Sequence, residues 1–179
     1  MGKNQDLIIA IQSSGDALSV CLLQDNESPV LLCGDPSLRQ SETLAPMLAQ
    51  LGVSDWSRVR LIAAGVGPGS FTGIRLGLAA AQGLGMARDI PVHGVSNFDL
   101  VRWVTGRENV AVRYNNDTFF ADNPPRVVPR DELPQDVIIQ DETHIRADNL
   151  ARFAAQTGRF VPAKPLYIAD AKVTVKCTK

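Results

Sequence analysis

The stretch GVGPGSFTGIRLGLAAAQGLGMA, residues 65–87, joins a glycine-rich turn to a long and almost wholly apolar segment. The apolar run RLIAAGVG before and into this turn, residues 60–67, predicts a buried strand, and residues 72–88 predict a helix. A strand, a glycine-rich turn and a helix in this order are also the elements of a phosphate-binding loop. The spacing of the residues tests whether this turn is one.

Two phosphate-binding patterns fail that test. A P-loop needs a lysine after its last glycine to reach the outer phosphates, and neither Gly69 nor Gly73 is followed by lysine. The dinucleotide pattern GxGxxG needs a third glycine that lets helix and strand pack closely. Here Ser70 or Thr72 holds that position, depending on where the count begins.

A weaker anion-binding site remains an alternative, because the N-terminus of any helix presents free N–H groups and the positive end of the helix dipole. The alternative is a tight turn in which glycines supply unusual dihedral angles and Ser70 or Thr72 caps the helix. The candidate anion-binding loop is Gly69, Ser70, Phe71 and Thr72.

The predicted helix has two different faces. One is nearly flat, so another backbone can approach it closely, and the opposite face holds only two polar residues. A helix that is apolar almost all round is normally buried on both sides. One side can pack on the sheet, and the other needs a cover, either the helix predicted at 38–51 or another protein. The close-packing face is Gly73, Gly77, Ala80 and Ala81, and the opposite face is Arg75, Leu78, Ala79, Gln82 and Met86.

The remaining pattern predicts a mixed α/β fold. Three short apolar runs at 7–11, 17–23 and 29–33 are separated by turn residues and predict an antiparallel meander. A helix with Leu44, Met47, Leu48 and Leu51 at helical spacing is expected over 38–51, followed by the 60–67 strand, the 72–88 helix, a strand at 90–96 and a helix opening at 97, with Ser96 or Asn97 as its cap.

Residues 107–179 are less regular. They predict a hairpin around 115–117, a proline-rich loop over 123–136, a short strand at 137–140 and a helix at 147–158 stopped by Gly158. We therefore expect a first lobe over 1–106 and a short, partly irregular second lobe over 107–179.

Composition narrows the function classes. The chain has 179 residues, 45% of them hydrophobic, and a formal net charge of −1. A protein that grips nucleic acid alone usually carries a strong basic excess. Cys21 and Cys33 lie in apolar runs and predict buried free thiols, and with Cys177 they show no zinc-like spacing. No run resembles a signal peptide or a membrane span, so the expected location is the cytoplasm.

No catalytic constellation is visible. His93 lies in an apolar strand and His144 in a polar loop, and the chain lacks HExxH and GxSxG motifs. No metal ligand set and no catalytic residue are predicted.

The run GVGPGSFTGIRLGLAAAQGLGMARDIPVHGVSNFDLV, residues 65–101, closely resembles TsaB, a family of bacterial tRNA threonylcarbamoyladenosine biosynthesis proteins. The likeness extends through LIIAIQSSGDALSVCLL and RQSETLAPML and covers roughly residues 7–105. PLYIAD, residues 165–170, also resembles the family's ending.

The resemblance implies an actin-like ATPase fold, related to ribonuclease H, and a subunit without catalysis or cofactor of its own. Its partners would be a catalytic TsaD-like paralogue and a TsaE-like ATPase. Together these proteins attach threonylcarbamoyl to the adenosine next to the anticodon of ANN-decoding tRNAs. The chain would meet tRNA only through the complex, and no membrane is involved.

The resemblance also implies where the partner binds. The family forms a helical bundle through its first-lobe helices, with TsaD or with a second copy of itself when alone. In this chain the implied interface residues are Leu44, Met47, Leu48, Arg75, Leu78, Ala79, Gln82 and Met86.

One departure bears on activity. Family members usually carry Asp-Thr-Ser after the first strand, where this chain has Gln12-Ser13-Ser14. In catalytic relatives of the fold an acidic residue there helps to hold metal and nucleotide. Gln12 therefore argues against one alternative, an independent ATPase or phosphotransferase. The other alternative, a peptidase, would require a metal site that two isolated histidines do not provide.

Overall fold

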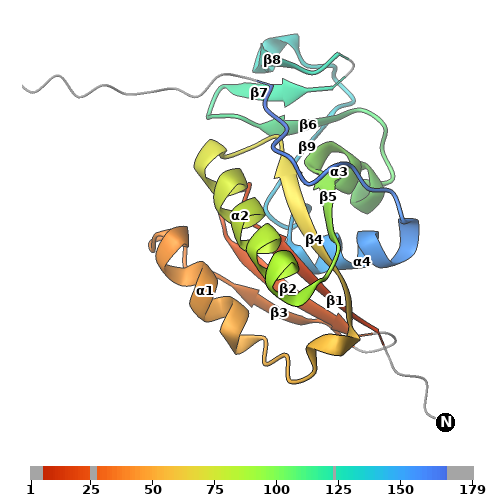
Figure 1. The fold of residues 1–179 in the computed structure, drawn as a ribbon. Coiled ribbons are helices and arrows are strands. Elements are labelled where there is room, and N and C mark those ends of the chain that lie inside the picture. Colours follow the sequence, from red (N-terminus) through yellow and green to blue (C-terminus); the bar gives the residue numbers. More distant parts are fainter. Residues whose placement is uncertain (1–5, 25–27, 123, 169–179) are drawn as a thin grey trace, which may run out of the picture.

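The computed structural model describes residues 6–24, 28–122 and 124–168, and Figure 1 shows them as two sheets with flanking helices. The larger sheet has the strand order β3-β2-β1-β4-β5. Its first three strands form the predicted antiparallel meander, while β4 and β5 run parallel to β1. The strands are β1 (Leu7–Gln12), β2 (Ser19–Gln24), β3 (Val30–Cys33), β4 (Val59–Gly67) and β5 (Val92–Ser96).

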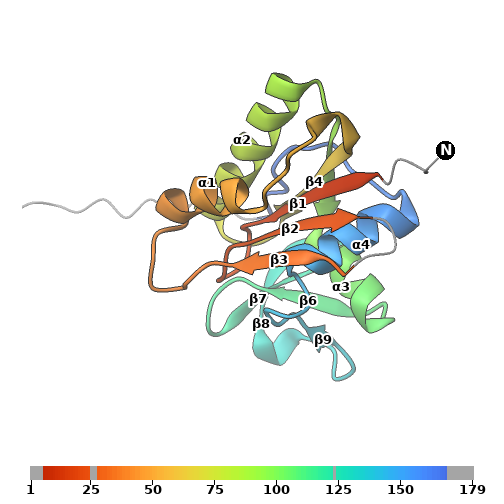
Figure 2. The same cartoon turned by 90° about the horizontal axis from the view of Figure 1, so that it is seen from below.

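Helices cover both faces of this sheet (Figure 2). Because side chains alternate along a strand, Ile9 and Ile11 of β1 pack toward α1 and α2, whereas Ile8 and Ala10 pack toward α3 and α4. The central strands are therefore apolar on both sides. The helices are α1 (Gln40–Gln50), α2 (Phe71–Arg88), α3 (Asn97–Thr105) and α4 (Ala147–Thr157), and a short 3₁₀ turn, η1 (Trp56–Arg58), precedes β4.

The smaller sheet has the order β8-β7-β6-β9. It corrects one prediction, since the proline-rich segment 123–136 contains a strand and the 3₁₀ turn η2 (Arg130–Glu132) as well as loop. That strand lies at the edge of the sheet, where Pro129 needs no N–H for pairing. The strands are β6 (Val110–Arg113), β7 (Thr118–Ala121), β8 (Arg126–Pro129) and β9 (Ile138–Ile139).

The two lobes expected from the sequence pack together, because parts of the second contribute to the core and edge of the larger sheet. Helix α4 follows the smaller sheet in the chain, yet Leu150 and Ala151 pack in the core beneath the larger sheet. A segment that we call the strap, residues 159–168, then returns along β5, where Val161 and Gly94 exchange both backbone hydrogen bonds at 3.0 Å. The division at residue 106 stays a prediction.

The cysteines differ from one another. Cys21 is buried, and burial, with a smaller contribution from the charge of Asp148, raises the pKa of its thiol to about 12. Cys33 was also predicted to be buried, but it is exposed because β3 is the edge strand of its sheet. Cys177 and residues 169–170 of the family-like ending lie outside the described residues. Within the described part of the chain, no helix is both long enough and apolar enough to cross a bilayer.

Candidate functional site

The glycine-rich turn brings the end of β4 against the loop that follows β1. Gly69 has a φ of 157°, and a Cβ there would overlap the carbonyl oxygen of Ser14. The Ser70 N–H donates to that same oxygen at 2.7 Å. The turn is therefore shaped by close backbone contact, which only glycine permits at position 69.

The start of α2 bears on the anion-binding prediction. Ser70 is the N-cap, and its Oγ accepts a hydrogen bond from the Gly73 N–H at 3.2 Å. Together with the Ser70–Ser14 bond, this contact occupies two N–H groups of the turn. The capping alternative is confirmed for Ser70, whereas Thr72 is exposed and caps nothing. The anion-binding role of residues 69–72 stays a prediction.

A closed polar network fills the ends of the parallel strands, next to this turn. The Gln12 side chain, fully buried at the end of β1, donates from Nε2 to Oδ1 of Asn97 at 3.1 Å and accepts from the Ser14 hydroxyl at 2.6 Å. Asn97 donates in turn to the Ser14 Oγ at 2.8 Å and to the Pro68 carbonyl at 2.7 Å. All of these groups are neutral amides, hydroxyls or carbonyls. The network joins β1, the glycine-rich turn and α3.

The inner face of α2 packs on the same loop. A Cβ at Gly73 would overlap the carbonyl oxygen of Ser13, and one at Gly77 would overlap the Ser13 hydroxyl. That hydroxyl donates to the Gly73 carbonyl at 2.7 Å. Ala81 is fully buried farther along the helix, and Ala80 is half-buried. In this chain the small residues permit close contact between helix and sheet.

The implied interface residues fall into two groups. Leu78 was placed on the outer face of α2, but it is 3% exposed and lies in the core that α1 and α2 share with the sheet. Leu44 and Met47 of α1 are buried in the same core, and Leu48 is half-buried. The outer surface of α2 is formed by four exposed residues, Arg75, Ala79, Gln82 and Met86. Met86 is 87% exposed.

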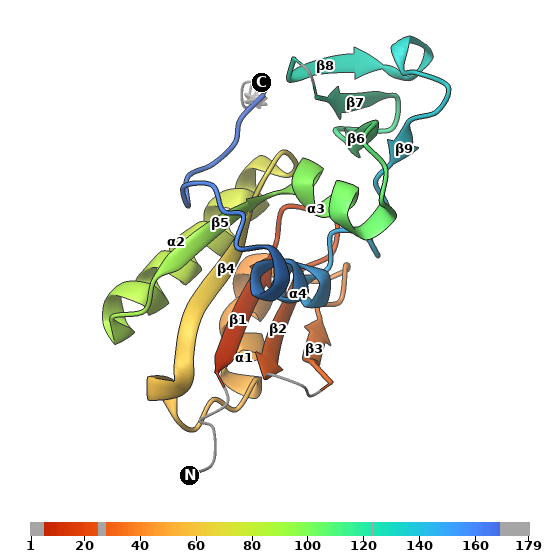
Figure 3. The same cartoon turned by 90° about the vertical axis from the view of Figure 1, so that its right-hand side faces the viewer.

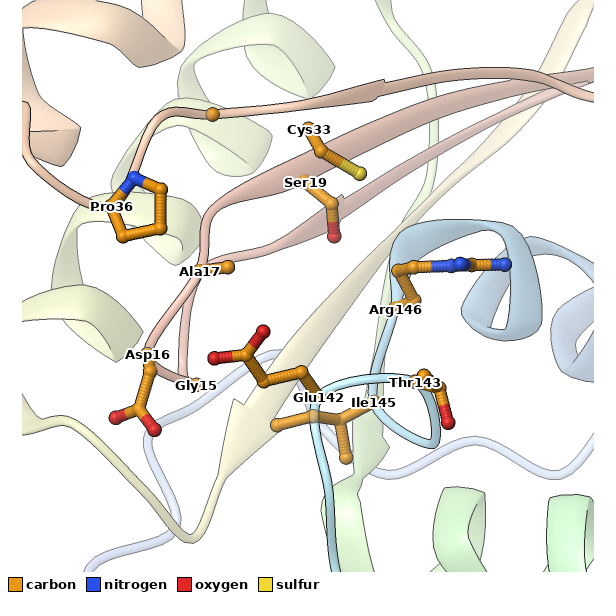
Figure 4. Close-up of a pocket in the computed structure, with 11 residues that line it drawn as sticks. Gly15, Asp16, Ala17, Ser19, Cys33, Pro36, Glu142, Thr143, Ile145 and Arg146 are labelled. Carbon is orange, nitrogen blue, oxygen red and sulfur yellow. The ribbon is translucent and has the colours of Figure 1, made fainter.

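Two cavities flank the turn between β1 and β2. The first, of about 270 Å³, lies between that turn, β3 and the loop before α4; its polar lining includes Ser19, Cys33, Glu142 and Arg146 (Figure 4). The second, of about 350 Å³, lies between the turn and the β6–β7 hairpin and is lined by Asp16, Arg113, Asn116 and Gln140 among others.

Several ionisable groups, at the first cavity and elsewhere, have contacts that serve local structure. Arg146 holds Asp148 through two hydrogen bonds of 2.8 and 2.7 Å. Burial raises the pKa of the Asp148 carboxyl, but these bonds and the positive charge outweigh it, so that pKa lies below its ordinary value. His93 stacks on Phe160 with ring centroids 4.2 Å apart. Among residues 6–24, 28–122 and 124–168, no cluster of three His, Cys, Asp or Glu side chains could hold a metal ion.

The meander, the parallel strands that follow it and helices on both faces define an actin-like, ribonuclease H-like fold. In agreement, the family model described as TsaD, tRNA N6-adenosine threonylcarbamoyltransferase, matches residues 38–104. Two solved structures from Pseudomonas aeruginosa share this fold. One is described as an uncharacterized protein with similarity to peptidase YEAZ, with a TM-score of 0.72 and 24% identity over 92% of this chain and 100% of that one. The other is YeaZ, with a TM-score of 0.71 and 23% identity over 90% and 99%.

Curated relatives carry a more specific name. The chain is 32% identical over 111 residues to the tRNA threonylcarbamoyladenosine biosynthesis protein TsaB of Escherichia coli, covering 59% of this chain and 47% of that protein. The protein of the same name from Haemophilus influenzae is 34% identical over 94 residues, covering 50% and 39%. The chain thus spans about half the length of the curated relatives it matches. Together these matches support a TsaB/YeaZ-like protein.

Sequence reasoning missed the Gln12–Asn97 network and the strap. Gln12 and Asn97 are 85 positions apart. The available signal was the position of both residues, each directly after a predicted strand, at 7–11 and at 90–96. In the structure β1, β4 and β5 are parallel, so side chains at these strand ends meet at one edge of the sheet.

Proposed function

We propose that this chain is a non-catalytic scaffold or activator subunit in the synthesis of tRNA threonylcarbamoyladenosine. It pairs with a TsaD-like catalytic paralogue, works with a TsaE-like ATPase and meets tRNA only through the complex. The observation that carries the proposal is the similarity to curated TsaB proteins. The TsaD family model adds to it, since its match over residues 38–104 includes β4, α2 and β5.

The polar network supports a subunit without catalysis of its own. Gln12 stands at the end of β1 where an acidic residue would be needed to hold metal and nucleotide, and its side-chain oxygen is already engaged by Ser14. Two hydrogen bonds from Ser14 and one to Asn97 fix this amide in place. Its neutral charge and its hydrogen bonds favour a structural role over nucleotide chemistry.

The outer surface of α2 supports a protein partner. Ala79, Gln82 and Met86 follow one another along the exposed side of the helix. Small side chains leave the backbone approachable, and a largely exposed methionine is a common component of adaptable binding surfaces. Four residues of the implied interface, Arg75, Ala79, Gln82 and Met86, thus lie where a second protein can reach them.

Reconstitution tests the proposal. The chain is co-expressed with a TsaD-like protein, the complex is isolated, and threonylcarbamoyladenosine in an ANN-decoding tRNA is quantified by mass spectrometry with and without the chain. We expect a stable complex and modification that depends on the chain. Full modification in its absence would refute the proposal, and so would modification that requires the chain but no complex between the two proteins.

A further inference from the structure

The strap ends on the exposed side of the first turns of α2. It leaves α4, runs alongside β5 and reaches the region of the glycine-rich turn (Figure 3). The Leu166 N–H donates to the Val66 carbonyl at 2.8 Å, and Gln82 of α2 donates from Nε2 to the Ala163 carbonyl at 2.8 Å. The strap is therefore fastened to both β4 and the outer side of α2.

Three residues at the end of the strap and the start of α2 form a compact group, which we call the Arg75 cluster: Phe71, Arg75 and Tyr167. The Tyr167 and Phe71 rings stack with centroids 4.8 Å apart. The Arg75 Nε–H donates to the Tyr167 hydroxyl at 2.8 Å, and the guanidinium carbon lies 3.9 Å from the centroid of the Phe71 ring. The guanidinium is thus held by a ring face and a hydroxyl.

The charge of Arg75 is not neutralised within the described part of the chain. Arg102 and Arg146 have carboxylate partners at 2.8 and 2.7 Å, whereas no carboxylate of residues 6–24, 28–122 or 124–168 forms an ion pair with Arg75. A guanidinium carries five N–H donors, and Tyr167 uses only the one on Nε. Its remaining fork fits a carboxylate in a bidentate manner.

We propose that Tyr167 is a positioning residue that holds Arg75 as a receptor for an acidic side chain of the TsaD-like partner. The inference rests on the proposed function and extends its surface from α2 onto the strap. Arg75 lies on the same exposed side as Ala79 and Gln82, so the cluster continues the surface proposed for that partner. Because the guanidinium is already held in place, little side-chain entropy is lost when the carboxylate binds.

Binding measurements with the purified partner test this role. Isothermal titration at low and high salt compares the wild type with Arg75→Gln, Tyr167→Phe and the double variant. Arg152→Gln is the matched control, because Arg152 is exposed on α4, which covers the other face of the sheet. We expect Arg75→Gln to weaken binding about tenfold or more and to reduce its salt dependence. Tyr167→Phe should weaken it roughly threefold and add nothing in the Arg75→Gln background. The control should bind like the wild type.

The outcomes separate this inference from the function on which it rests. If the wild type binds the partner and Arg75→Gln binds equally well, the receptor is wrong while the proposed function stands. If the effects of Tyr167→Phe and Arg75→Gln simply add, Tyr167 does not act through Arg75 and the positioning role is wrong. If the wild type itself fails to bind, the proposed function fails and takes the inference with it. Thermal melts of all variants within about 2 °C of the wild type exclude unfolding as the cause.

Discussion

The glycines of α2 differ in how closely their surroundings pack against them. A Cβ at Gly73 would overlap the backbone carbonyl of Ser13, which directly follows β1. At Gly83, by contrast, an added Cβ meets nothing within 4 Å. Glycine is about 1 kcal/mol less favourable than alanine in a helix interior. Gly73 is therefore required by packing, and Gly83 is a position where packing sets no such limit.

This contrast predicts opposite effects of the same substitution. Gly73→Ala should lower the free energy of unfolding by about 2 kcal/mol or more, because a backbone oxygen must move. Gly83→Ala should raise it by roughly 0.5–1 kcal/mol. Urea denaturation measures both. Equal stability changes in the two variants would show that the inner face of α2 is not closely packed.

The Asp148 carboxylate predicts an acid-dependent contribution to stability. Its pKa in the folded protein lies below its ordinary value of 3.8, because the bonds from Arg146 outweigh the effect of burial. A group with a lowered folded-state pKa stabilises the protein above its unfolded-state pKa, and this contribution is lost as the pH falls through the folded value.

Asp148→Asn should therefore be less stable than the wild type at pH 7. We expect a difference of roughly 1–2 kcal/mol, because Arg146 is partly exposed and solvent screens its interaction with Asp148. The difference should shrink as the pH falls below about 4. Denaturation at a series of pH values measures it, and Arg146→Gln should show the same trend because it removes the other half of the pair. A difference that stays constant down to pH 2 would contradict this assignment.

At the scale of elements, the strap closes the open edge of β5. Gly94 makes this possible, since a Cβ there would come within 2.6 Å of the Pro162 carbonyl oxygen and 2.9 Å of that of Val161. The exchange of hydrogen bonds with Val161 extends the sheet by one irregular segment. The strap and the outer side of α2 are therefore one structural unit.

Gly94→Ala should loosen that unit. We expect faster hydrogen exchange at the Val161 and Leu166 amides, whose bonds to Gly94 and Val66 hold the strap, and little change in the amides of β1. The free energy of unfolding should fall by about 1–3 kcal/mol. Uniformly faster exchange across the larger sheet would show instead that the strap and the core open together.

Local sequence patterns predict the larger sheet well, because its strands are short apolar runs bounded by turn residues. The elements that escape prediction lack such patterns. β8 lies between prolines and pairs only along one edge, and the strap has neither helical nor strand periodicity. β8 depends on pairing with the preceding strand β7, and the strap depends on β5 and α2, which are distant in the chain. The residues of β8 and of the strap therefore carry no clear pattern of their own.

The candidate site could be predicted only in part. Helical spacing correctly separates Gly73 and Gly77 from Arg75 and Ala79. It places Leu78 on the wrong side, because a rotation of 100° per residue gives an approximate face while the neighbouring α1 decides what is covered. The anchoring of Arg75 by Tyr167 joins residues 92 positions apart, and only the fold brings them together.

At the scale of the whole molecule, the two helical layers have different surroundings. α3 and α4 lie on the side of the larger sheet nearer the smaller sheet, while α1 and α2 lie on the other side (Figure 2). The polar network of Gln12 and Asn97 joins the strand ends between these layers. Both helical layers carry exposed residues, and the proposed function assigns the α1–α2 layer to the partner.

Two matched substitutions test which layer the partner meets. Ala79 on α2 and Ala155 on α4 are both exposed alanines in helices on opposite faces of the sheet. Ala79→Glu should lower the affinity for a TsaD-like protein about tenfold or more, because the new carboxylate, one helical turn from Arg75, competes with the partner's acidic side chain for that guanidinium. Ala155→Glu should leave the affinity unchanged, and both variants should melt within about 2 °C of the wild type, as expected for surface substitutions. Titration of each variant with the partner measures the affinity. A loss of affinity confined to Ala155→Glu would show that the partner binds the α3–α4 layer instead.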